Sequence, residues 1–155
     1  MTTVYHTGLT LDELLKLPEQ KPALEYFNGE VTQKASPLPR HSRLQYKFAN
    51  FINDYSEPRR LALPLPELRG TFAGASRVPD VGVFRWARIP RRPDGQIDDD
   101  QFIPPDIAIE ILSPGQSRRD QVEKCRRFVA NGVGIALQVE DRRQSVTRFA
   151  ALRID

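Results

Sequence analysis

The sequence predicts one domain of mixed α/β class, spanning residues 1–155, in which helices pack on a mixed central sheet. A chain of 155 residues is long enough for a single sheet-and-helix core. Amphipathic stretches with helical spacing alternate with short apolar stretches rich in Val and Ile. The resulting order of helix, hairpin, helix, strands, helix, strands is typical of helices packed on a mixed sheet.

The N-terminal part predicts a short helix and then a hairpin. Thr10 and Glu13 have the spacing of a capping box, and Pro18 ends the helix that this box opens. Asn28-Gly29 favours a tight turn because both residues tolerate positive φ. The extended segments that the turn joins are 23–27 and 30–34.

The middle of the chain predicts one long helix, over 41–55, followed by a proline-marked connection. Apolar side chains at helical spacing give this helix one apolar face; they are Leu44, Phe48, Phe51, Ile52 and Tyr55. The prolines of the connection are Pro58, Pro64 and Pro66. Short strands are expected at 68–72 and 78–84.

The C-terminal part predicts a surface loop over 86–105, then a strand, a helix over 118–131 and two more strands, at 135–139 and 145–152. Ser117 stands where a helix N-cap is expected. Cys125 lies on the apolar face of the helix and is expected in the core.

One predicted strand carries two carboxylates in an otherwise apolar run. Asp106 and Glu110 are four residues apart, so both project from one face, while Ile107, Ile109 and Ile111 fill the other. A buried Glu is costly unless a metal, a Lys or Arg, or a raised pKa compensates it. The compensating partner of Glu110 is therefore the central question of function.

Composition and charge limit the class of protein. The hydrophobic fraction of 39% and charged fraction of 28% suit a soluble globular chain. Residues 1–10 have no signal-peptide pattern, and no apolar run approaches the roughly 20 residues of a membrane span. A single cysteine suits a reducing, cytoplasmic setting. The net charge of +3 is compatible with nucleic acid but does not identify it.

Two predicted strands begin with Pro-Asp, at Asp80 and at Asp106. If these strands are neighbours, Asp80 and Glu110 converge on one edge of the sheet. Two carboxylates and a backbone carbonyl form an oxygen-rich site suited to Mg²⁺ or Mn²⁺. Such an ion makes phosphodiester hydrolysis possible, because it polarises a phosphoryl oxygen and lowers the pKa of bound water.

Several short motifs resemble the Uma-type family of the PD-(D/E)XK restriction-endonuclease-like superfamily. The resemblance spans about Leu9 to Phe149. The motifs that carry it are Glu25–Val31, Ser36–His41, Asp80, Glu110–Pro114, Arg119–Lys124, Gly132-Val133 and the strand at Ile135–Val139. The resemblance implies a restriction-endonuclease-like core with an N-terminal hairpin and a metal-dependent endonuclease that acts on DNA, with no organic cofactor and no membrane partner. It also implies a homodimer, because such nucleases pair their active sites to cut both strands.

In that superfamily an Asp and a Glu hold the divalent ion, and a Lys two residues after the Glu activates water. The resemblance gives the metal to Asp80, Glu110 and the carbonyl of Ile111. This chain departs from the pattern at Leu112, which can do no acid-base work. Some members supply the lysine from the following helix, where Lys124 is the matching residue; Lys34, in the hairpin, is a weaker substitute.

Further residues are candidates for supporting roles. Glu25 is a candidate accessory ligand, because superfamily sites often draw an acid from the N-terminal segment. His41 is either a phosphate-binding residue, a base, or a capping or packing histidine. The basic pair Arg118-Arg119 is a candidate phosphate contact.

Two readings from other functional classes stay open. A catalytically inactive copy of the fold would bind only nucleic acid or a protein, and Leu112 favours it. A structural or regulatory oligomer would use the acidic residues in a buried ion-pair network. The geometry around Glu110 discriminates among the three.

Overall fold

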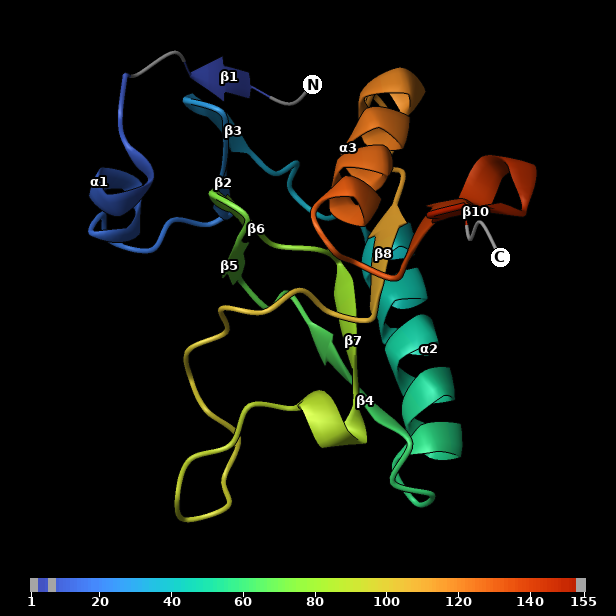
Figure 1. Cartoon of the computed structure of the whole chain (residues 1–155). Coiled ribbons are helices and arrows are strands. Elements are labelled where there is room, and N and C mark those ends of the chain that lie inside the picture. Colours follow the sequence, from blue (N-terminus) through green and yellow to red (C-terminus); the bar gives the residue numbers. More distant parts are fainter. Residues whose placement is uncertain (1–2, 6–7, 153–155) are drawn as a thin grey trace.

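Two five-stranded sheets and three α-helices form the described part of the chain, residues 3–5 and 8–152, in a computed structural model (Figure 1). Residues 1–2 and 6–7, within the segment expected to lack a signal peptide, lie outside the described residues. The mixed α+β architecture agrees with the class that the sequence predicts. Among the described residues, no helix is both long and apolar enough to cross a membrane.

The central sheet is mixed. Its strand order is β10-β9-β8-β7-β4, in which β8 and β9 are parallel and the other neighbours antiparallel. The strands are β4 (Ala62–Pro66), β7 (Val81–Arg85), β8 (Ile107–Ile111), β9 (Ile135–Glu140) and β10 (Ser145–Ala150). A parallel pair needs a long crossover, and helix α3 (Arg118–Ala130) supplies it between β8 and β9.

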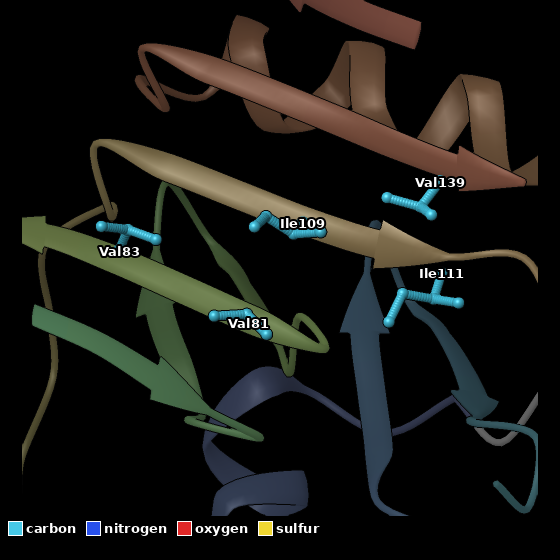
Figure 2. Close-up of a cluster of buried hydrophobic side chains, with 5 residues drawn as sticks. All are labelled: Val81, Val83, Ile109, Ile111 and Val139. Carbon is cyan, nitrogen blue, oxygen red and sulfur yellow. The ribbon is translucent and has the colours of Figure 1, made fainter. Parts of the chain in front are cut away.

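Helix α2 (Pro39–Ser56) covers one face of this sheet. Alternation along the strands turns Val and Ile side chains toward it: Val81, Val83, Ile109, Ile111 and Val139 form a buried cluster (Figure 2). Of the apolar face predicted for the helix, Leu44, Phe48 and Ile52 pack against this cluster, together with Ala49. The prediction was wrong for Phe51 and Tyr55, which are exposed.

Helix α3 covers the opposite face of the sheet. Ala108 and Ala136 leave room there for Cys125, Phe128 and the neighbouring Val133. Burial raises the pKa of the Cys125 thiol to about 12, so this cysteine is an uncharged core residue, as its helical position predicts. Glu110 shares the face of Ala108, so the carboxylate points to the α3 side of the sheet.

The second sheet has the order β1-β3-β2-β6-β5. Its strands are β1 (Thr3–Tyr5), β2 (Leu24–Phe27), β3 (Glu30–Gln33), β5 (Gly70–Phe72) and β6 (Ala75–Arg77). The predicted Asn28-Gly29 turn joins β2 to β3, with φ values of 51° and 80°. The predicted capping box of Thr10 and Glu13 opens helix α1 (Leu11–Leu15).

One expectation from the sequence was wrong, and one hairpin was predicted only in part. The connection marked by Pro64 and Pro66 is strand β4, at the edge of the central sheet. An edge strand tolerates proline because its outward amides need no partner strand. The predicted N-terminal hairpin forms a second sheet with the β5-β6 hairpin, which turns at Ala73-Gly74. The sequence predicted β5 of this second hairpin but not β6.

The polar segment after β7 is a long connection, as predicted. It begins with a 3₁₀ turn, η1 (Trp86–Arg88), and contains an isolated bridge between Arg91 and Ile97. A second 3₁₀ turn, η2 (Asp141–Arg143), joins β9 to β10.

Candidate active site

The register of β7 and β8 brings the two Pro-Asp strands together. Val81 pairs with Ile109 in the antiparallel ladder, so Asp80, one residue before, lies across from Glu110, one residue after. Both carboxylates are buried, with exposed fractions of 2% and 3%. The backbone N–H of Ile111 donates to Asp80 Oδ2 over 2.7 Å, which joins the end of β8 to this aspartate.

Asp80 is held as an anion. Lys34 Nζ lies 2.9 Å from Oδ1, and His41 Nε2, from the first turn of α2, lies 3.1 Å from Oδ2. Burial would raise the pKa of Asp80, but the hydrogen bond from His41 and the charge of Lys34 outweigh it and hold the pKa well below its usual range.

Lys34 stays charged in this arrangement, and Asp80 favours the protonated form of His41. Burial would lower the pKa of His41, but its hydrogen bond to Asp80 and the charge of that carboxylate raise the pKa instead. Burial would likewise lower the pKa of Lys34, yet the surrounding carboxylates, Asp80 first, raise it. The histidine that the sequence left between packing and chemistry therefore contacts the buried aspartate.

Glu110 is compensated by Lys124. The Lys124 ammonium reaches from α3 over the sheet to within 2.9 Å of Glu110 Oε1. Burial raises the pKa of Glu110 to about 7. The charge of Lys124 lowers this pKa, but the negative charge of Asp80 offsets part of that effect. Burial would lower the pKa of Lys124, but Glu110 and Glu25 raise it, so the ammonium stays charged.

Helix α3 is positioned by its own sequence. The predicted N-cap, Ser117, accepts a hydrogen bond from the Asp120 amide, and Cys125 and Phe128 fix the buried face. Lys124 stands beside that face, with a side chain only 16% exposed.

Glu25, on β2, is the second carboxylate of Lys124. Its Oε1 lies 3.0 Å from Lys124 Nζ and accepts the Val78 amide over 2.7 Å. Burial would raise the pKa of Glu25, but Lys124 and Lys34 lower it. One ammonium thus bridges an ionised Glu25 and a Glu110 whose pKa is raised.

Three residues of the site were not predicted as members. Glu67 lies at the rim, with both carboxylate oxygens 3.1 Å from Lys34 Nζ, and Gln45 donates to Glu67 Oε1 over 2.9 Å. Arg77 is buried with its guanidinium 4.8 Å from the Phe27 ring, and burial lowers its pKa. Their spacing along the chain gives no signal, since only the meeting of the two sheets brings them together.

The remaining candidates lie elsewhere. Arg118 Nε pairs with Glu140 Oε2 at 3.3 Å, and Arg119 is exposed. Asp106 does not join Glu110: its carboxylate accepts the Arg85 amide over 2.8 Å and pairs with Arg88 at 2.7 Å.

The carboxylates and lysines line an open cavity of about 910 Å³ between the two sheets and the starts of α2 and α3. It includes Glu25, His41, Asp80, Glu110 and Lys124, while neither Arg118 nor Arg119 lines it. Among its described lining residues, eight carboxylates face six lysine or arginine side chains. The cavity therefore favours an added cation over an added anion.

Oxygen donors of the type that hard divalent cations prefer are present in this cavity. Within residues 3–5 and 8–152, no group of three or more His, Cys, Asp or Glu is arranged to hold a metal ion. Magnesium, however, is usually bound by one or two carboxylates together with waters and substrate phosphates. Glu110 Oε1 is buried and, despite its ion pair, has no hydrogen-bond donor among the described residues. Asp80 and Glu110 therefore fit such an ion in donor chemistry.

Comparison with known proteins identifies the family. The model of the Uma2 family, described as "Putative restriction endonuclease", matches residues 11–152. The chain belongs to the Uma2 family. The resemblance to this family that the sequence indicates is thereby confirmed.

A solved structure is similar to this Uma2 chain over nearly its whole length. It is the crystal structure of "a putative nuclease belonging to DUF820" from Anabaena variabilis ATCC 29413, with 39% sequence identity and a TM-score of 0.89. The match covers 94% of this chain and 81% of that one. No match is found among curated proteins.

Proposed function

We propose that this Uma2 protein is a divalent-metal-dependent endonuclease that hydrolyses DNA phosphodiester bonds. The observation that carries the proposal is the contact between Lys124 and Glu110. The superfamily pattern requires a lysine beside the metal-binding glutamate, and Leu112 occupies its usual position. A Lys124 ammonium 2.9 Å from Glu110 supplies the missing group from helix α3. The family description and the description of the Anabaena relative both name nucleases.

Asp80, Glu110 and the main-chain carbonyl of Ile111 would hold Mg²⁺ or Mn²⁺. Bound there, the ion would polarise a phosphoryl oxygen and lower the pKa of a bound water. Asp80 remains ionised across the neutral range, because His41 and Lys34 stabilise its charge. Glu110, with a pKa of about 7, gives up its proton more readily as positive charge enters the site.

Lys124 would stabilise the attacking water and the negative charge that develops on the phosphate. Its ammonium is anchored on two carboxylates, which fixes its position, and its pKa is raised, which keeps it charged. A buried, fixed charge stabilises a transition state more strongly than a solvated one, because it needs no reorganisation during the reaction. Glu25 orients Lys124, and His41 orients Asp80.

DNA would approach over the open side of the cavity, and the protein would act as a homodimer in the reducing cytoplasm. The carboxylate excess around Asp80 and Glu110 opposes a phosphate until the divalent ion is bound. Arg118 and Arg119, outside the cavity, would contact phosphates beside the one that is cleaved.

A cleavage assay on supercoiled plasmid, with Mg²⁺ or Mn²⁺, tests the proposal. Wild-type protein should nick or linearise the plasmid only with the metal, and Asp80→Ala and Glu110→Ala should abolish the cutting. Metal-dependent cutting that survives both substitutions would exclude this site as its source.

A catalytically inactive nuclease fold that binds nucleic acid or a protein is the second candidate. One observation favours it: Lys34 and Lys124 already neutralise the two carboxylates, as in a structural ion-pair network. This candidate predicts no cutting with either metal.

A further inference from the structure

The ammonium group of Lys34 lies in a shell of oxygen atoms. Its Nζ is 2.8 Å from the Val78 carbonyl, 2.9 Å from Asp80 Oδ1 and 3.1 Å from each carboxylate oxygen of Glu67. An ammonium has three hydrogens. The shell therefore offers four oxygens to three donors, an excess that a spherical cation would use better than a lysine does.

The shell has a fixed inner side and an open outer side. The Asp80 side chain is 3% exposed and is also bound by His41 and by the Ile111 amide. The Glu67 side chain is 48% exposed at the rim, whereas that of Lys34 is 12% exposed. Lys34 can therefore leave Asp80 without losing a counter-ion, because it can stay paired with Glu67 nearer to solvent.

Lys34 and a divalent ion cannot both neutralise Asp80 from the same side. Positive charges a few ångströms apart repel strongly in a site of low dielectric. Lys34 Nζ donates a hydrogen bond to Asp80 Oδ1. Asp80 Oδ2 is hydrogen-bonded to His41 Nε2 and to the Ile111 amide. No oxygen of Asp80 is thus free of a donor while Lys34 is in place.

We propose that Lys34 is the counter-ion of Asp80 in the metal-free protein and that its ammonium moves to Glu67 at the rim when a divalent cation binds at Asp80. The inference rests on the proposed function, since it concerns the same metal site. It makes Lys34 a regulator of metal affinity: the lysine keeps the buried aspartate compensated in the metal-free protein and sets a threshold of metal concentration for loading.

Metal binding by the full-length chain tests the proposal without measuring cleavage. Free Mn²⁺ is followed by electron paramagnetic resonance during titration of wild type, Lys34→Met and Lys47→Met. Lys47 is an exposed lysine on α2 and controls for the change in net charge. Removing the competing ammonium should tighten Mn²⁺ binding about tenfold or more in Lys34→Met alone. Equal affinity in all three proteins, or weaker binding in Lys34→Met, would overturn the proposal.

A second measurement uses the wild type and so does not depend on the folding of Lys34→Met. Reductive methylation with mass spectrometry reports how accessible each lysine amine is. Labelling of Lys34 should rise several-fold when Mn²⁺ is added, while labelling of Lys47 stays constant. Unchanged or reduced labelling of Lys34 in protein that binds Mn²⁺ would overturn the inference and leave the proposed function standing. Failure of the wild type and of Lys34→Met to bind Mn²⁺ would overturn both.

Discussion

Glu110 is the residue at which burial most directly opposes the ionised form of a carboxylate. A carboxylate 3% exposed in the middle of a sheet loses its hydration, and its pKa of about 7 reports that loss. Asp80 is equally buried, but the hydrogen bond from His41, the charge of Lys34 and the Ile111 amide hold it ionised. The two carboxylates thus differ in proton affinity because of their partners and not because of their depth.

The raised pKa of Glu110 predicts a decline in stability with pH. Native Glu110 binds its proton more tightly than the unfolded chain does, so the free energy of unfolding should fall as pH rises from 4.5 to about 7. The expected fall is about 3 kcal/mol. Urea unfolding of Glu110→Gln across this range should show most of that decline removed. Glu123→Gln, an exposed carboxylate on α3, should keep it; a decline unchanged in Glu110→Gln would contradict the assignment.

Removing the cation from the buried carboxylates should destabilise the fold. Lys124→Met leaves Glu25 and Glu110 buried without their shared ammonium, which should cost about 3–5 kcal/mol at neutral pH. The cost should shrink near pH 5, where Glu110 takes up a proton. Denaturant unfolding at both pH values measures it, with the exposed Lys47→Met as control. Equal stability of Lys124→Met and wild type would show that these ion pairs are not buried in solution.

At the scale of elements, helix α3 brings Lys124 to the buried carboxylate of the central sheet. It crosses between the parallel strands β8 and β9, and its buried face sets the rotation that turns Lys124 toward Glu110. The start of the helix is fixed by the Ser117 hydroxyl, which accepts the Asp120 amide over 3.2 Å.

Loss of this cap should weaken the helix. Ser117→Ala leaves the Asp120 amide without its side-chain acceptor and should lower the free energy of unfolding by about 1 kcal/mol. The matched control is Ser42→Ala, an exposed serine inside α2, where the change should stay within about 0.5 kcal/mol. Chemical denaturation of both variants checks the difference. Equal effects would mean that Ser117 does not cap α3.

The sequence was sufficient wherever a local pattern determines a strand or helix. The capping box, the Asn28-Gly29 turn and the alternation in β8 are such patterns. The alternation in β8 also predicted that Asp80 and Glu110 face each other, once the two strands that begin with Pro-Asp were taken as neighbours. Strand β4 was missed because prolines normally interrupt ladders, and only an edge position tolerates them. Glu67 and Gln45 were missed because their contacts with Lys34 and Asp80 join distant segments.

At the scale of the whole molecule, the two sheets meet at the candidate site. Glu25 lies on β2 and Lys34 directly after β3, both of the second sheet. Asp80 lies directly before β7 and Glu110 on β8, both strands of the central sheet, and Lys124 lies on α3. The site therefore needs both sheets and helix α3. The same meeting of the sheets forms the open cavity of the candidate site.

Binding to DNA should depend steeply on salt. Each neutralised phosphate releases counter-ions, so affinity for a labelled duplex should fall at least about tenfold between 50 and 200 mM salt. Fluorescence anisotropy measures this with Glu110→Gln, which should prevent cutting. If Arg118 contacts a phosphate, Arg118→Ala should lower the salt slope by about 1. An absence of binding at any salt concentration would instead favour an oligomer held by its buried ion pairs.

The most direct test of a metal-dependent nuclease centred on Asp80 compares two aspartates that each follow a proline at the start of a strand. Asp80→Asn and Asp106→Asn make the same chemical change, but only Asp80 faces Glu110. In plasmid cleavage with Mn²⁺, Asp80→Asn should lose activity by about 10²-fold or more, while Asp106→Asn should cut like the wild type. Cleavage retained in Asp80→Asn, or lost equally in both variants, would contradict the assignment of the site.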